Sequence, residues 1–193
     1  MYLVVEIRTI NENISIALLD LRAFALGQNI AVKRDLERAG TRHLLRNLLK
    51  SDDYELNYTA ENKPFLKGRN EHISISHSHD KLVIILNKKE NTGIDIEQIR
   101  DKVKNVQFKF LSETELSFAK DKADKLITLW AAKEALYKVY GLKEVEFIKN
   151  LFIEDFSGHE ITGSIVMENF KKTYRLISED IADYKMVYVL HEL

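Results

Sequence analysis

The stretch GIDIE at positions 93–97 alternates apolar and acidic residues, and the stretch WAAKEALYK at positions 130–138 has helical spacing. Alternate residues of a strand point to the same face, so Asp95 and Glu97 are expected side by side on a predicted strand. Glu134 and the lysine four residues later are expected on one face of a predicted helix. The two stretches therefore predict a strand and a helix that both carry carboxylates.

The flanking segments also mix strand-like and helix-like patterns. β-branched residues and two-residue alternation predict strands over 2–10, 72–76, 82–86, 94–99, 150–156, 160–167, 173–177 and 184–190. Helices are predicted over 18–26, ended by Gly27, over 31–50, from Ser112 onward, and over 124–140. A turn at 91–93 favours an antiparallel hairpin between 82–86 and 94–99. We therefore expect an α+β fold with antiparallel sheets packed with helices.

Composition limits the classes of function. The 193 residues include 29 basic and 30 acidic side chains, for a net charge of -1, and no cysteine. The near-neutral balance argues against a general nucleic-acid partner, and the lack of cysteine excludes disulfides and a thiolate nucleophile. The N-terminus does not resemble a signal peptide, and no apolar run approaches the roughly 20 residues that span a bilayer. We expect a cytoplasmic protein with no membrane partner.

The acidic residues have two interpretations that the sequence leaves open. Asp95 and Glu97 suit a hard divalent cation, which prefers oxygen ligands, but a solvated strand face has the same pattern. Glu134 and Lys138 form either an ordinary ion pair between helix turns or a third metal carboxylate with a lysine for phosphate. Trp130 is interpreted as a core residue.

Four motifs in order carry a resemblance to a known family. GIDIE and WAAKEALYK, preceded by NKPF at 62–65 and SISHS at 74–78, are similar to the signature segments of the phosphopantetheinyl transferase superfamily. The length resembles the monomeric surfactin-synthetase-activating type, which implies two similar α+β halves in a pseudo-twofold arrangement, here over 1–97 and 98–193. The implied activity moves phosphopantetheine from coenzyme A to a serine of an apo acyl or peptidyl carrier protein.

The resemblance also implies roles for single residues. Asp95, Glu97 and Glu134 would hold Mg²⁺. The side chains expected at the coenzyme A phosphates are Ser76, His77, Lys133 and Lys138, and Lys138 would also take part in catalysis. Glu115 resembles the general base for the carrier serine. The spacing Ser112-x-x-Glu115 is also that of a capping box, so a structural role for Glu115 stays open, with water on the metal as the alternative base.

An arginine stripe marks the predicted helix over 31–50. Arg34, Arg38, Arg42 and Arg46 are each four residues apart, which makes either a solvated face or an anion site. The resemblance assigns the 3'-phosphate of coenzyme A to Arg42, with Arg38 a weaker candidate. It also places Lys63 and Pro64 beside the adenine.

The carrier protein is expected to dock beside residues 99–111. Phe108, Phe110 and Leu111 would be the apolar contacts, unless they form a buried helix face.

Two other functions remain open at this point. A non-catalytic relative would bind coenzyme A or carrier proteins without transfer, and an unrelated magnesium phosphohydrolase would use water in place of the serine.

Overall fold

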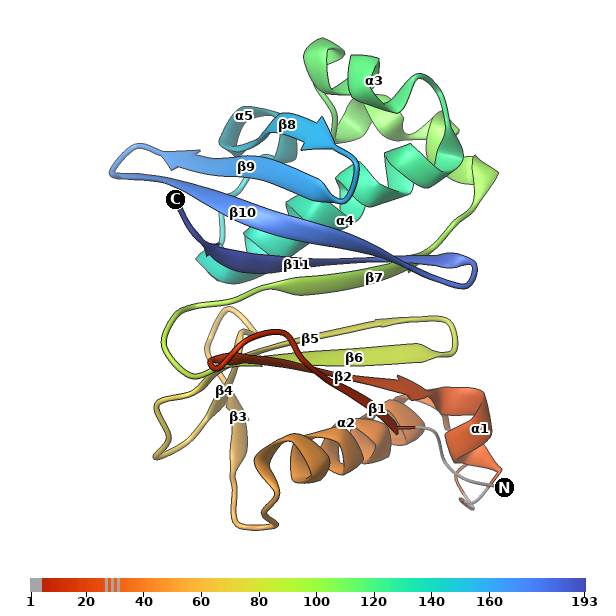
Figure 1. The fold of residues 1–193 in the computed structure, drawn as a ribbon, viewed down its shortest axis with the longest axis vertical. Helices are drawn as coiled ribbons and strands as arrows, with labels where there is room; N and C mark the ends of the chain where they lie inside the picture. Colours follow the sequence, from red (N-terminus) through yellow and green to blue (C-terminus); the bar gives the residue numbers. More distant parts are fainter. Residues whose placement is uncertain (1–4, 27, 29, 31) are drawn as a thin grey trace. The chain divides into compact units, whose positions relative to one another are not determined.

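The computed structural model describes residues 5–26, 28, 30 and 32–193, and the chain forms two compact units, Met1–Asn91 and Thr92–Leu193 (Figure 1). Each unit has an antiparallel sheet and one long helix, so the expected α+β class with antiparallel sheets and helices is confirmed. The strand that carries Asp95 and Glu97 belongs to the second unit, whereas the sequence placed both residues at the end of the first half.

The first unit is built on a four-stranded sheet in the order β1-β2-β6-β5. The strands are β1 (Val5–Thr9), β2 (Ile14–Asp20), β5 (His72–Ser78) and β6 (Lys81–Asn87). The long helix α2 (Lys33–Leu49) packs on β2 and β6 through its buried Leu44 and Leu45. A short hairpin of β3 (Leu56–Tyr58) and β4 (Pro64–Leu66) completes the unit.

The predicted helix over 18–26 is wrong in its first half. Leu18 and Leu19 belong to β2, where they pair with Val83 and Leu82, and the helix α1 is limited to Leu21–Ala25. Pairing inside the sheet overrides the helical pattern, because it buries Leu19 completely in the core while Leu18 is only half-buried. Gly27 and the first residues of the predicted strand 2–10 and helix 31–50 lie outside the described residues.

The second unit has a five-stranded sheet in the order β7-β11-β10-β9-β8. Its strands are β7 (Ile94–Gln98), β8 (Leu151–Ser157), β9 (Glu160–Met167), β10 (Phe170–Ile181) and β11 (Tyr184–Glu192). Helix α4 (Ala123–Tyr140) lies across one face of this sheet, mainly against β11 and β7 (Figure 1). The other elements are α3 (Glu113–Ala119), α5 (Phe147–Asn150) and two 3-10 turns, η1 (Asp101–Asn105) and η2 (Gln107–Lys109).

The expected hairpin between 82–86 and 94–99 is also wrong. β6 pairs with β5 and β2, whereas β7 pairs with β11, so that Asp95 lies opposite Val187. A turn signal reports only on local geometry, and it cannot reveal a better partner near the end of the chain. The last four predicted strands are confirmed, and β8, β9, β10 and β11 pair in chain order as an antiparallel meander.

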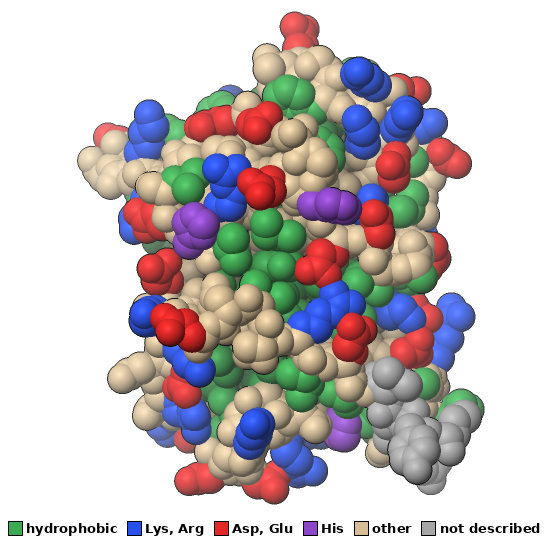
Figure 2. Space-filling model, in the orientation of Figure 1, with side chains coloured by type: hydrophobic (Ala, Val, Ile, Leu, Met, Phe, Trp, Pro, Cys, Tyr) green, Lys and Arg blue, Asp and Glu red, His purple; other side chains and the backbone are tan. Residues whose placement is uncertain are grey.

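The distribution of charge and the character of the helices agree with the composition. Acidic and basic side chains are intermixed over the face of the molecule in Figure 2, with no broad field of one sign. Among the described helices, none has both the length and the apolarity required to cross a lipid bilayer.

Candidate active site

Three carboxylates approach one another between β7 and α4. Val187, opposite Asp95 across the sheet, is a buried core residue on the face that α4 covers. Cross-strand neighbours share a face, so Asp95, and Glu97 two residues on, are directed toward α4. Glu134 projects from α4, and Lys138 one turn later donates from Nζ to Asp95 Oδ1 at 2.8 Å and to the Ile94 carbonyl at 2.9 Å.

The pKa of Glu134 is affected by the charges of the neighbouring side chains. The pKa of Glu134 is raised from 4.5 to about 7, first by burial and then by the charge of Asp95, with a smaller contribution from Glu97, while Lys138 opposes the rise. Asp95 itself is only 4% exposed. The site therefore concentrates negative charge in a poorly solvated place, which favours a bound cation.

The residue types fit a hard divalent cation. Carboxylate oxygens are the ligands that Mg²⁺ prefers, and the ammonium of Lys138 already lies against Asp95. Within the part of the chain that the structure describes, no three acidic or imidazole side chains are arranged as a ready metal cluster. The three side chains therefore have the chemistry that would hold such a cation, although the structure does not arrange them as a closed ligand set.

Gly93 explains how α4 comes so near β7. A Cβ atom on this residue would lie 1.9 Å from the carbonyl oxygen of Ala135, a contact that no side chain can make. Ala135 follows Glu134 directly in α4. The glycine therefore sets the spacing between the carboxylate of the helix and those of the strand.

Glu115 and Lys133 lie together in the interior. Lys133 is 0% exposed, and its Nζ donates to Glu115 Oε2 at 2.8 Å and to the Phe147 carbonyl at 2.9 Å. Burial lowers the pKa of Lys133, and its pairing with Glu115 works against that change. Lys133 is therefore shielded from solvent, which differs from the phosphate contact expected for it. Lys138, in contrast, has a side chain that is 24% exposed.

The capping box at the start of α3 is confirmed. The Glu115 amide donates to Ser112 Oγ, and the Ser112 amide donates to Glu115 Oε2 at 2.8 Å. The Ile153 amide donates to the other carboxylate oxygen at 2.8 Å, and Glu115 is 2% exposed. In this arrangement the carboxylate has no open path to an incoming serine.

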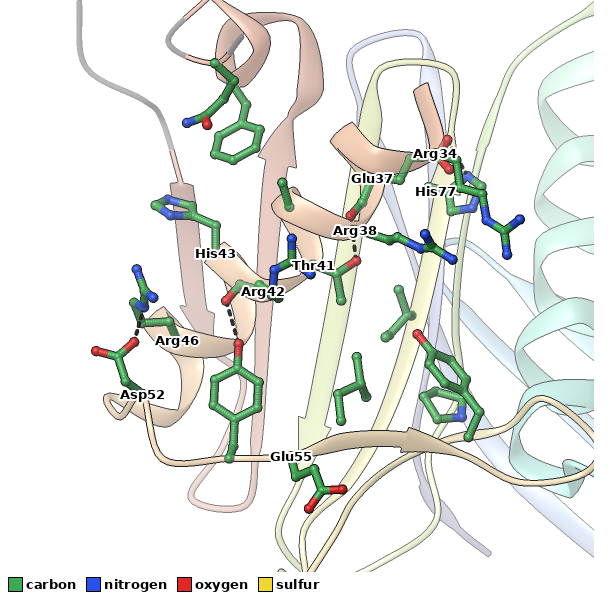
Figure 3. A pocket seen from close by; sticks show the side chains of 18 of the residues that line it. Arg34, Glu37, Arg38, Thr41, Arg42, His43, Arg46, Asp52, Glu55 and His77 are labelled. Atoms are coloured by element: carbon green, nitrogen blue, oxygen red, sulfur yellow. Dashed lines mark hydrogen bonds and ion pairs between the residues drawn. The ribbon is translucent and has the colours of Figure 1, made fainter. Parts of the chain in front are cut away.

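A separate pocket of about 1110 Å³ lies in the first unit. α2 lines it with the whole arginine stripe, Arg34, Arg38, Arg42 and Arg46, and β5 adds His77. Figure 3 shows Arg34 and His77 at one end, and Arg46 with Asp52 at the other. Arg46 forms an ion pair with Asp52, and Tyr54 donates to the Arg42 carbonyl at 2.9 Å. The stripe therefore lines a pocket, and its guanidinium groups are of the type that can bind an anion.

Comparison with known families gives a result for the region that contains the acidic cluster. A family model described as the 4'-phosphopantetheinyl transferase superfamily matches residues 91–189. The chain belongs to the 4'-phosphopantetheinyl transferase superfamily. Among curated proteins, the search found no match to this chain.

Phosphopantetheinyl transferases act on coenzyme A and carrier proteins, and the structure distributes the expected coenzyme A residues unevenly. Arg38, Arg42, Pro64 and His77 line the arginine pocket. Lys63 instead faces a second, smaller pocket, where burial lowers the pKa of its ammonium group. Ser76 is 7% exposed and does not line the arginine pocket.

Two tyrosines of the arginine pocket were not predicted from the sequence. Tyr54 and Tyr58 come from the segment around β3 and line the wall beside Pro64. No local pattern marks them, because their place in the pocket depends on tertiary contacts such as the hydrogen bond from the Tyr54 hydroxyl to the Arg42 carbonyl. The four arginines of the pocket, by contrast, were predicted as one stripe from their four-residue spacing.

The structure separates the three apolar residues that were expected at the carrier protein. Phe108 is 69% exposed, but Phe110 and Leu111 are each 3% exposed. Phe110 packs edge-on against Trp130, with ring centroids 4.9 Å apart. Phe110 and Leu111 therefore belong to the core of the second unit, against which Trp130 packs, and Phe108 is the one residue of the three that is exposed.

Proposed function

We propose that this protein transfers the 4'-phosphopantetheine group of coenzyme A to the serine hydroxyl of an apo acyl or peptidyl carrier protein, with Mg²⁺. The observation that carries the proposal is the meeting of Asp95, Glu97 and Glu134 beside Lys138, inside the region that the family model matches. A non-catalytic relative would have no use for three carboxylates in a place where their mutual repulsion is costly.

The chemistry is a displacement at the β-phosphorus of coenzyme A. The serine hydroxyl gives up its proton to water, its oxygen forms a bond to this phosphorus, the bond to the bridging oxygen breaks, and adenosine 3',5'-bisphosphate leaves with the negative charge. Asp95, Glu97 and Glu134 would hold Mg²⁺, which when bound neutralises charge on the pyrophosphate oxygens. The partly exposed ammonium of Lys138 can turn from Asp95 toward a phosphate oxygen on its flexible stem.

The arginine pocket of the first unit is proposed to take the 3'-phosphate. Arg42 and Arg38 present guanidinium groups, which match phosphate oxygens in two-point contacts. Arg38 pairs only weakly with Asp35, at 3.6 Å between exposed side chains, so an anion can replace this partner. His77 lies 3.5 Å from Glu37, and protonation would add a further donor at the same end.

The carrier protein is proposed to dock where Phe108 is exposed. The exposed Lys102 and Lys109 flank this side chain in sequence, on the η1 and η2 turns. An apolar anchor with lysines around it suits an acidic partner surface. We propose that the protein acts as a cytoplasmic monomer.

The test is direct transfer of label. The purified protein is incubated with a fluorescent coenzyme A analogue and a panel of apo carrier proteins, with Mg²⁺ or with EDTA. Labelling of at least one carrier only with Mg²⁺ is expected, together with its loss in Asp95→Asn and Glu134→Gln. Glu113→Gln, an exposed carboxylate on α3, serves as the matched control.

Other outcomes would contradict the proposal. Cleavage of coenzyme A without any carrier would indicate a phosphohydrolase. Binding of coenzyme A and carrier with no transfer under any condition would indicate a non-catalytic relative.

A further inference from the structure

The interior of the second unit contains an ion pair that the proposed chemistry does not use. Glu115 and Lys133 are 2% and 0% exposed, and their charged atoms lie 2.8 Å apart. A buried charge is costly unless it is paired and fully hydrogen-bonded. Any function assigned to either residue must therefore account for the whole set of bonds around them.

Glu115 is saturated on both carboxylate oxygens. Oε2 accepts from the Ser112 amide and from Lys133 Nζ, each at 2.8 Å, and Oε1 accepts from the Ile153 amide at 2.8 Å. Lys133 Nζ donates in addition to the Phe147 carbonyl at 2.9 Å. The network thus joins the start of α3, the middle of α4, the start of α5 and the strand β8.

We infer that Glu115 and Lys133 are positioning residues, which lock α4 in place so that Glu134 faces Asp95, and that neither touches the substrate. This inference rests on the proposed transferase function. A general base must come within hydrogen-bonding reach of the proton that it removes, and a phosphate ligand must reach the phosphate. Neither condition holds for side chains that are enclosed by backbone groups.

The position of Lys133 explains the direction of Glu134. Neighbouring residues of a helix point about 100° apart, so fixing Lys133 against α3 and β8 also fixes where Glu134 points. On the other side of α4, the contact of Gly93 with Ala135 limits the distance to β7. The ion pair and the glycine together hold Glu134 in one orientation.

A mutant cycle separates positioning from chemistry. Glu115→Gln and Lys133→Met each leave a buried group without its charged partner, so each should lower the melting temperature by roughly 5 °C or more. Each should also lower kcat at least about tenfold and weaken Mn²⁺ binding, measured directly by calorimetry, because α4 loses its lock. The double variant has no unpaired charge, since methionine fills the space of the lysine stem.

The double variant should regain most of the melting temperature, the Mn²⁺ affinity and the kcat of the wild type, to within about threefold for the rate. A general base cannot be restored by a second substitution at another residue. If the double variant recovers its melting temperature but stays as slow as Glu115→Gln, Glu115 acts on the substrate and the inference is overturned.

Lysine labelling of the unmodified protein gives a second test that does not depend on variants. A small acylating reagent should modify Lys138 far faster than Lys133, and coenzyme A with Mg²⁺ should protect Lys138 alone. Rapid labelling of Lys133 that coenzyme A suppresses would also overturn the inference. Melting temperature, Mn²⁺ affinity and labelling need no transfer activity. A failure of the proposed function is therefore distinguishable from a failure of the positioning role of Glu115 and Lys133.

Discussion

Glu134→Gln is predicted to stabilise the protein at alkaline pH while it abolishes transfer. The pKa of Glu134 rises from 4.5 to about 7 on folding, first because of burial and then because of the charge of Asp95. Each pKa unit corresponds to about 1.4 kcal/mol, so ionised Glu134 lowers the free energy of unfolding by about 3 kcal/mol. A stabilising substitution at a catalytic position is the signature of a strained functional site.

The sign follows from proton linkage. The folded state binds the Glu134 proton more tightly than the unfolded state does, so this penalty is absent below about pH 4.5. It grows as the pH rises toward about 7 and is constant above that value. Glutamine cannot ionise, so the advantage of the variant should be small at pH 4.5 and reach about 3 kcal/mol at pH 8.

The assay is urea unfolding from pH 4.5 to 8 in EDTA, followed by the fluorescence of Trp130. This residue is the single tryptophan of the chain and lies on α4 one turn before Glu134. Added Mg²⁺ should stabilise the wild type at pH 8 and the variant much less, because binding relieves the repulsion. Glu113→Gln is the control. Parallel pH curves for wild type and Glu134→Gln would refute the argument.

Three further predictions concern other parts of the molecule. Arg42→Ala should reduce the preference for coenzyme A over dephospho-coenzyme A at least about tenfold in kcat/KM, since the lost contact is charge-assisted; an unchanged ratio would exclude Arg42 from the 3'-phosphate site. Gly93→Ala should destabilise the second unit by more than about 3 kcal/mol in urea unfolding, because its Cβ would lie 1.9 Å from the Ala135 carbonyl oxygen. Gly158→Ala, at a positive φ with open space around it, should cost only about 1 kcal/mol, and equal costs for the two would contradict the packing argument. Phe108→Ala should raise KM for the carrier protein about tenfold and leave KM for coenzyme A unchanged, as expected for an exposed interface anchor; parallel rises in both constants would place Phe108 elsewhere.

Local patterns in the sequence were sufficient wherever a structure depends on neighbours along the chain. Ser112 and Glu115 predicted a capping box that the structure contains, and the predicted helix over 124–140 ends at Tyr140, where Gly141 follows with φ 67°. The alternation in GIDIE predicted a shared face for Asp95 and Glu97. These features follow from periodicity and from backbone geometry, both of which a short segment encodes by itself.

Pairing between distant segments could not be predicted in this way. The turn before Ile94 suggested a partner in 82–86, but β7 pairs with β11 near the other end of the chain. Leu18 and Leu19 looked helical and form part of a strand. In both cases several arrangements satisfy the local pattern, and burial in a complete sheet selects among them.

The two lysines of one helical motif show most clearly what local sequence patterns cannot predict. Lys133 and Lys138 carry the same charge in the same helical motif, and both were expected at phosphates. The tertiary structure encloses Lys133 against Glu115 and leaves Lys138 partly exposed beside Asp95. The sequence by itself determined the helix, the motif and the chemical types of the side chains. Only the packing of α3, α5 and β8 around one side of α4 decided which ammonium group meets solvent, because exposure depends on residues that are distant in the chain.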